Sequence, residues 1–261
     1  MRSAECGLKI LINGHNLNVE KHGPENGPIV VLLHHGLGSV RAWRGQIPAM
    51  VEAGYRVLAY DRWGYGKSED RSALDLPTFM TDLEDLCSLL DVLGIPRATL
   101  VGHSDGGTIA LYFSALHPKR VKCLVTIAAH IYVEPKMEPA ILGIRQAFEQ
   151  DNRFRKGMHS AHGEKYEAVF QHWFDGWHRF ELLGWDMRPV LDQIRCSSLI
   201  IQGEGDEHAS PQHAKDIAAS IHGAELWLMA GAKHMLPQEN SVEFNLKVLQ
   251  FLKDHANDEQ T

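Results

Sequence analysis

Several marks of common protein classes are missing from this sequence. No apolar run is long enough to cross a bilayer, and the first residues carry no apolar segment typical of a secretory signal. The four cysteines are scattered without a C-x-x-C pair, a pattern that favours reduced, packed thiols. No basic block occurs, and a net charge of -7 argues against a surface for nucleic acid. These absences predict a cytoplasmic protein with neither nucleic acid nor membrane as a partner.

What the sequence does contain is an alternation of strand and helix patterns along most of its 261 residues. Short apolar, β-branched runs are followed by segments with apolar residues at helical spacing. Such alternation predicts an α/β fold with a mostly parallel, doubly wound sheet and right-handed crossovers, preceded by a hairpin at Asn13-Gly14. The expected strands are 8–12, 17–21, 29–33, 56–60, 99–101, 121–129, 198–202 and 225–229, and the expected helices are 42–53, 76–93, 108–116, 212–221 and 242–255.

The alternation stops at about residue 131 and resumes after about residue 189. The intervening segment shows no strand pattern and is rich in aromatic residues at three- and four-residue spacing, as on one face of an amphipathic helix. We therefore expect a core of residues 1–130 and 189–261 with a helical cap inserted at 131–188. The apolar stripe of the cap comprises Tyr166, Val169, Phe170, Trp173, Phe174, Trp177 and Phe180.

A serine lies at the apex of a predicted strand–turn–helix unit, in Gly102-His103-Ser104-Asp105-Gly106-Gly107. A nucleophile held between a strand end and a helix start adopts a strained backbone, and side chains two residues before and after it would collide. Gly102 and Gly106 remove that collision. An N-cap serine in an ordinary turn is the alternative, but a nucleophile is favoured because partner residues follow in the order that this motif needs.

A serine hydroxyl needs a base, and the base needs an acid that orients it. In a sheet of this type such groups lie at the carboxyl ends of strands. His234 follows the strand at 225–229 and is the expected base, whereas His103 is expected to face away from the serine. Asp206 follows the strand at 198–202 and is the expected acid. Glu204 and Glu207 are the alternatives to Asp206.

The tetrahedral intermediate of acyl transfer carries an oxyanion, which needs preorganised donors. One expected donor is the backbone N–H of Asp105, at the start of the helix that follows the serine. The other is the backbone N–H of Leu37, in a loop that Gly36 and Gly38 allow to bend inward.

Two other motifs are rejected as sites. Gly66-Lys67-Ser68 resembles the end of a phosphate-binding loop, but Asp61 stands where that loop needs glycine, and an acid there would repel phosphate. His159 and His162 are two neighbours without further ligands, which is too few for a metal site.

Together these motifs resemble the α/β-hydrolase superfamily, and they span the chain. The resemblance rests on His35-Gly36, Asp61-Arg62-x-Gly64-x-Gly66-x-Ser68, Gly102-x-Ser104-x-Gly106-Gly107, Asp206 and His234. More narrowly, Ser104-Asp105-Gly106-Gly107, with Trp173-x-Asp175-Gly176-x-x-x-Phe180 in the cap, resembles the valacyclovir-hydrolase-like carboxylesterases. The resemblance implies hydrolysis of carboxylic esters without a metal or organic cofactor.

Asp105 and the cap aromatics each have two interpretations. Asp105 either serves the dipole of its helix or, as the resemblance implies, holds a cationic group of the substrate such as an α-ammonium. Most of the aromatic stripe packs the cap on the core, and Trp177 or Trp185 is a candidate for lining an apolar acyl or alcohol pocket.

The sequence thus predicts a serine hydrolase that cleaves small carboxylic esters through an acyl-enzyme, with amino-acid esters as candidate substrates. A C–C bond hydrolase, a lactonase or an amidase would use the same three residues with a different pocket. A small-molecule receptor on this fold is the alternative outside enzymes. Haloalkane dehalogenation is disfavoured, because the motif carries serine where that chemistry needs a carboxylate.

Overall fold

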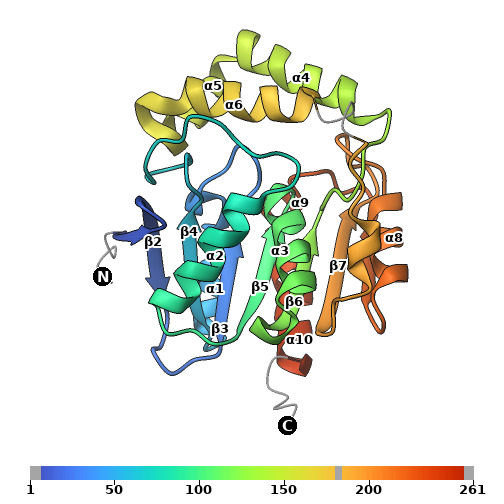
Figure 1. Cartoon of the computed structure of the whole chain (residues 1–261). Helices are drawn as coiled ribbons and strands as arrows, with labels where there is room; N and C mark the ends of the chain where they lie inside the picture. Colours follow the sequence, from blue (N-terminus) through green and yellow to red (C-terminus); the bar gives the residue numbers. More distant parts are fainter. Residues whose placement is uncertain (1–6, 180–183, 256–261) are drawn as a thin grey trace.

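A computed structural model describes residues 7–179 and 184–255 of the chain. Its strands form one sheet in the order β1-β2-β4-β3-β5-β6-β7-β8 (Figure 1). The hairpin β1–β2 and the pair β2–β4 are antiparallel, and every pair from β4 to β8 is parallel. The strands are β1 (Leu8–Ile12), β2 (His15–His22), β3 (Ile29–Leu33), β4 (Arg56–Asp61), β5 (Ala98–His103), β6 (Val121–Ile127), β7 (Ser197–Gly203) and β8 (Glu225–Met229).

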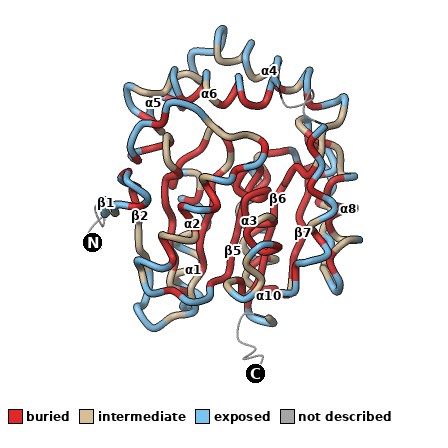
Figure 2. Tube along the Cα trace, in the orientation of Figure 1, coloured by how far each residue is buried: buried red, intermediate tan, exposed pale blue. Residues whose placement is uncertain are grey.

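Helices cover both faces of this sheet, which is why its central strands read as continuous apolar runs. One apolar cluster joins one sheet face to α2, α3 and α8, and a second joins the other face to α1 and α10. Figure 2 shows the resulting buried strands between partly exposed helices. The core helices are α1 (Ile47–Glu52), α2 (Met80–Val92), α3 (Asp105–Leu116), α7 (Arg188–Leu191), α8 (Gln212–Ser220), α9 (Leu236–Glu239) and α10 (Ser241–His255), with short 3-10 turns at Val40–Trp43 and Pro118–Arg120. Another 3-10 turn, Gly163–Lys165, lies in the segment between the two parts of the core.

A further group of helices lies across one end of the sheet, at the top of the view in Figure 1. It consists of α4 (Met137–Gln150), α5 (Asn152–His162) and α6 (Tyr166–Arg179). Trp173 and Trp177 of α6 are buried together with Val169, Phe170 and Phe174, so the apolar stripe faces the protein interior; Phe180 lies outside the described residues. We propose that residues 131–188 form the cap as an insertion in the core. Among the described residues, no helix is long and apolar enough to span a membrane.

Three of the expected helices differ by three residues or more from those in the structure, and one of them, expected at 108–116, begins at Asp105. The segment 42–53 forms a 3-10 turn ending at Trp43 and a separate helix beginning at Ile47, with Gly45 between them and Pro48 in the first turn of α1. Proline is favoured in a first helical turn but disrupts a helix interior, which explains the division. The helix expected at 76–93 begins at Met80, because the backbone of Phe79 is left-handed (φ 53°) and cannot continue a right-handed helix.

Candidate active site

Ser104 lies at a sharp turn between β5 and α3. Its backbone has φ 54° and ψ −120°, a conformation that residues other than glycine rarely adopt. Its own N–H donates to the carbonyl of Ile127 on the neighbouring strand β6 at 2.7 Å, which fixes the turn against the sheet. The strained backbone lifts the serine side chain out of the line of the strand, as a nucleophile at this position requires.

The glycines on either side of Ser104 are required by close backbone contacts. A Cβ atom at Gly102 would overlap with the carbonyl of Gly106, and one at Gly106 would overlap with the carbonyl of Leu33. Both obstacles are backbone atoms in the core, so neither can move aside as a flexible side chain would. The turn can therefore form only with glycine at both positions.

Replacement of Gly106 by alanine is expected to lower the free energy of unfolding by about 3 kcal/mol or more, because the added methyl group has no space beside Leu33. Gly143→Ala is the matched control. Gly143 lies inside α4 with no atom within 4 Å of an added Cβ, so this change should raise stability by up to about 1 kcal/mol. Urea denaturation of both variants measures the difference; equal effects would contradict this account of the turn.

His234 and Asp206 lie together at the carboxyl end of the sheet. His234 Nδ1 is 2.9 Å from Asp206 Oδ2. Asp206 is buried, and its carboxylate also accepts hydrogen bonds from the side chain of Gln202 and the backbone N–H groups of His208 and Ala209. Burial opposes the charged form of Asp206, but the His234 imidazole and these hydrogen bonds hold its pKa well below the ordinary range. A permanently charged carboxylate therefore orients the imidazole.

The two alternative acids lie elsewhere in the same loop. Glu204 and Glu207 are both exposed, and Glu207 accepts a hydrogen bond from the backbone N–H of His234 rather than from its ring. Among the described residues, Asp206 is the one candidate of the three that forms a hydrogen bond with the His234 ring. This geometry favours Asp206 as the orienting acid.

His103 has a structural role that the sequence did not reveal. It is fully buried, and its Nε2–H donates to the backbone carbonyl of His234 at 2.9 Å. Burial, with the nearby His234 imidazole, lowers the pKa of His103 to about 3, so the ring is neutral. His103 therefore connects the turn at Ser104 to the loop that carries His234. The only sequence signal was a polar residue at the end of a buried strand.

Ser104 and His234 open onto one cavity of about 430 Å³ beneath the cap. Leu37 and Asp105, whose N–H groups are the expected oxyanion donors, line the same cavity. Asp105 is the first residue of α3, so its N–H has no partner within the helix. Among the described residues no hydrogen bond joins Ser104 to His234; such contacts are often long in a free enzyme and tighten when substrate binds. The remaining wall is mainly apolar and includes Met137, Ile141, Ile144, Phe154, Met158 and Trp173.

The two candidate tryptophans are placed differently. Trp177 lines the cavity, and its indole N–H donates to Asp105 Oδ1 at 3.1 Å. Trp185 is not among the residues that line this cavity; its indole N–H donates to the hydroxyl of Tyr112 at 2.8 Å. The two rings pack edge to face with centroids 6.1 Å apart. Trp185 thus packs against Trp177 instead of lining the cavity, and its position in the sequence alone did not specify this.

Comparison with known proteins shows the family of this chain. Residues 28–188 match the family described as the alpha/beta hydrolase fold. The chain belongs to that family. It is 32% identical to human Serine hydrolase BPHL over 251 residues, covering 94% of this chain and 86% of the relative, and 30% identical to the mouse protein over 257 residues, covering 96% and 88%. The crystal structure of a hydrolase from Pseudomonas aeruginosa superimposes with a TM-score of 0.76 at 25% identity, covering 96% of this chain and 99% of that one.

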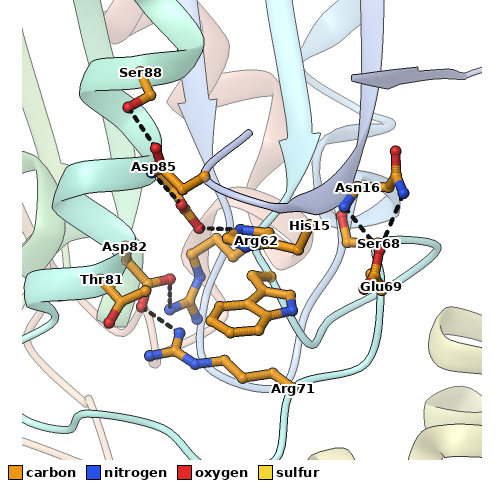
Figure 3. Close-up of polar contacts among 12 residues, drawn as sticks. His15, Asn16, Arg62, Ser68, Glu69, Arg71, Thr81, Asp82, Asp85 and Ser88 are labelled. Atoms are coloured by element: carbon orange, nitrogen blue, oxygen red, sulfur yellow. Dashed lines mark hydrogen bonds and ion pairs between the residues drawn. The ribbon is translucent and has the colours of Figure 1, made fainter. Parts of the chain in front are cut away.

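This α/β hydrolase also contains a chain of alternating charges that runs from its surface to the cavity. Arg62 Nη2 is 3.6 Å from Asp105 Oδ2, and Arg62 Nη1 is 3.2 Å from Asp82. Asp82 in turn pairs with Arg71 at 3.0 Å, and Arg71 pairs with the partly exposed Asp75. Figure 3 shows the contacts of both Arg62 and Arg71 with the Asp82 carboxylate. Two arginines thus share three carboxylates. Asp105 is the last carboxylate in this series of ion pairs and borders the cavity.

Asp105 is held in an unusual electrostatic environment by this arrangement. Burial raises its pKa to about 6, against the opposing effect of Arg62 and with a further contribution from the negative charge of Asp82. Its Oδ2 forms no hydrogen bond with the described residues, although it is buried. The sequence could not show this, because Arg62 and Asp82 approach Asp105 only through the fold.

Asp105→Asn is expected to gain stability relative to the wild type as pH rises. A carboxyl whose pKa is raised in the folded state stabilises that state below its unfolded pKa of about 4, and this contribution is lost as pH rises through about 6. Asparagine does not titrate, so the variant has no such stabilisation to lose as pH rises. Between pH 4.5 and pH 7.5 the difference in unfolding free energy should shift by about 2 kcal/mol in favour of the variant. Urea denaturation at both pH values measures it, and parallel pH profiles would rule out the raised pKa.

Proposed function

We propose that this protein is a serine hydrolase of carboxylic esters. Ser104 is the nucleophile, His234 the general base, Asp206 the orienting acid, and the N–H groups of Leu37 and Asp105 the oxyanion donors. The observation that carries the proposal is the convergence, on one largely apolar cavity, of a strained serine and a histidine that is hydrogen-bonded to a buried, charged aspartate. The similarity to the proteins named Serine hydrolase BPHL supports it.

The reaction proceeds in two acyl-transfer steps. Ser104 Oγ attacks the ester carbonyl carbon while His234 Nε2 takes the hydroxyl proton, and the two backbone N–H groups stabilise the oxyanion. The intermediate collapses, and the leaving alcohol takes the proton from His234. Water then attacks the acyl-enzyme, giving its proton to His234, and Ser104 regains that proton as the carboxylic acid is released.

The composition of the cavity supports an ester with an apolar acyl or alcohol group. Its volume of about 430 Å³ suits a small molecule, and Met137, Met158 and Met235 give the wall adaptable side chains. Within this class, Asp105 is the residue that would select amino-acid esters through their ammonium group. If it does, Asp105→Asn lowers kcat/KM for amino-acid esters far more than for plain acyl esters; equal relative rates would contradict the selection.

Turnover of a short p-nitrophenyl ester by the purified protein tests the proposal. Release of p-nitrophenolate above the uncatalysed rate is expected, with acyl-chain length, lactones and C–C bond substrates as the comparison panel. Saturable binding of the ester without product release would indicate a receptor. Preference for a lactone or a C–C bond substrate would retain the nucleophile but reject the ester class.

A further inference from the structure

The loop that carries the Leu37 N–H forms a tight turn over residues 35–38, which we call the oxyanion turn. The N–H of Gly38 donates to the carbonyl of His35 at 3.0 Å and closes it. Gly36 and Gly38 supply little side-chain packing of their own, so other groups must fix the direction of the Leu37 N–H.

Two buried histidines contact the oxyanion turn in the same way. His34 Nδ1–H donates to the carbonyl of His35 at 2.8 Å, and His162 Nε2–H donates to the carbonyl of Leu37 at 3.1 Å. The other nitrogen of each ring accepts a backbone N–H from the loop after β4: His34 Nε2 from Arg62 at 3.1 Å and His162 Nδ1 from Gly66 at 2.9 Å. Each imidazole therefore bridges the oxyanion turn to the same second loop.

The two fixed carbonyls lie on either side of the functional peptide. The carbonyl of His35 belongs to the peptide unit before Gly36, and the carbonyl of Leu37 belongs to the unit before Gly38. Between them lies the single peptide unit that contains the Leu37 N–H. Holding both neighbouring planes restricts rotation of the unit between them, which is the preorganisation that an oxyanion donor requires.

Both bridges require neutral rings of opposite tautomers. Each accepting nitrogen faces a backbone N–H, so a proton there would place two donors head to head. Burial lowers the pKa of His34 well below its usual value and that of His162 to about 4. His34 must carry its proton on Nδ1 and His162 on Nε2. His162 comes from α5, so one bridge also joins the cap to the core.

Resting on the proposed function, we propose that His34 and His162 are positioning residues that fix the oxyanion turn, and that docking of the cap through His162 completes the oxyanion hole. Neither residue contacts the reacting atoms. Their effect reaches the reaction through the Leu37 N–H alone, so it concerns the transition state rather than the binding of substrate.

Kinetics of His162 variants test the proposal. His162→Phe should lower kcat by about tenfold to a hundredfold with KM unchanged, because small misplacements of a donor have effects of that size. His162→Gln keeps an N–H donor and an acceptor and should recover part of the loss. Arg41→Ala is the matched control, since Arg41 donates to the carbonyl of Ser160 and joins the same part of the cap to the core without contacting the turn. Its kcat should stay within about twofold of the wild type.

Imidazole ¹⁵N NMR of the wild-type protein separates this proposal from the proposed function, because it needs no turnover. Nδ1–H at His34 and Nε2–H at His162 are expected at neutral pH. The proposal is overturned if either ring shows the other tautomer or a second proton. It is also overturned if folded His162→Phe keeps its kcat, or if Arg41→Ala loses as much. Failure of the wild type to cleave any ester would instead reject the function.

Discussion

Ser104→Ala is expected to lower kcat for a p-nitrophenyl ester by on the order of 10⁶-fold, to the residual rate that binding and oxyanion donors alone provide. In the proposed mechanism the Ser104 hydroxyl forms the acyl-enzyme, and the strained backbone of the turn presents this hydroxyl to the cavity. Because Ser104 is small and its side chain faces the cavity, the change should leave the fold intact. Initial rates and thermal unfolding of the two proteins provide the measurement.

Ser114→Ala is the matched control for this experiment. Ser114 is a buried serine on the same helix, and its hydroxyl donates to the carbonyl of Ala110 one turn earlier. Its loss should leave kcat unchanged within about twofold. Retention of more than about one per cent of wild-type activity in Ser104→Ala would show that another group attacks the ester.

The second large effect is expected for Asp206→Asn, which should lower kcat by about 10⁴-fold. Asp206 Oδ2 accepts the Nδ1–H of His234, and in the proposed mechanism this leaves Nε2 free to take the proton of the serine. An amide at this position has no charge to stabilise the imidazolium and can donate to Nδ1, which favours the wrong tautomer. The measurement is kcat across the pH range in which the variant remains folded.

Glu204→Gln is the control for the loop that carries Asp206. Glu204 is exposed in the same turn, and its side chain has no role in the proposed site. The activity of the Glu204→Gln variant should therefore match that of the wild type. Comparable losses in Asp206→Asn and Glu204→Gln would mean that the loop, rather than the carboxylate beside His234, determines the rate.

Local sequence patterns predicted most of the fold of this chain. Buried strands such as β3 read as continuous apolar runs because helices cover both faces of the sheet. The turn at Ser104 could be located from the sequence because the turn requires glycine at positions only two residues from the serine. The placing of Asp206 beside His234 followed from a topological rule, since parallel strands end at one edge of the sheet.

The contacts that no pattern indicated are those between segments far apart in the sequence. His162 reaches Leu37 only because the cap folds back over the sheet, and Arg62 meets Asp105 only because β4 and the nucleophile turn end on the same side. Trp185 is an aromatic residue of the cap, as Trp177 is, yet it pairs with Tyr112 instead of lining the cavity. Each of these contacts depends on how the cap and the loops dock on the core. Side-chain packing determines that docking, and the periodicity of the sequence does not reveal it.

Covalent labelling of the intact protein with a fluorophosphonate ester tests the central claim most directly, because this reagent captures a serine activated by its neighbouring base. We predict one adduct per chain, located by peptide mass spectrometry at Ser104, and none in Ser104→Ala. An adduct at a different residue, or ester turnover that continues in a protein fully labelled at Ser104, would contradict the account.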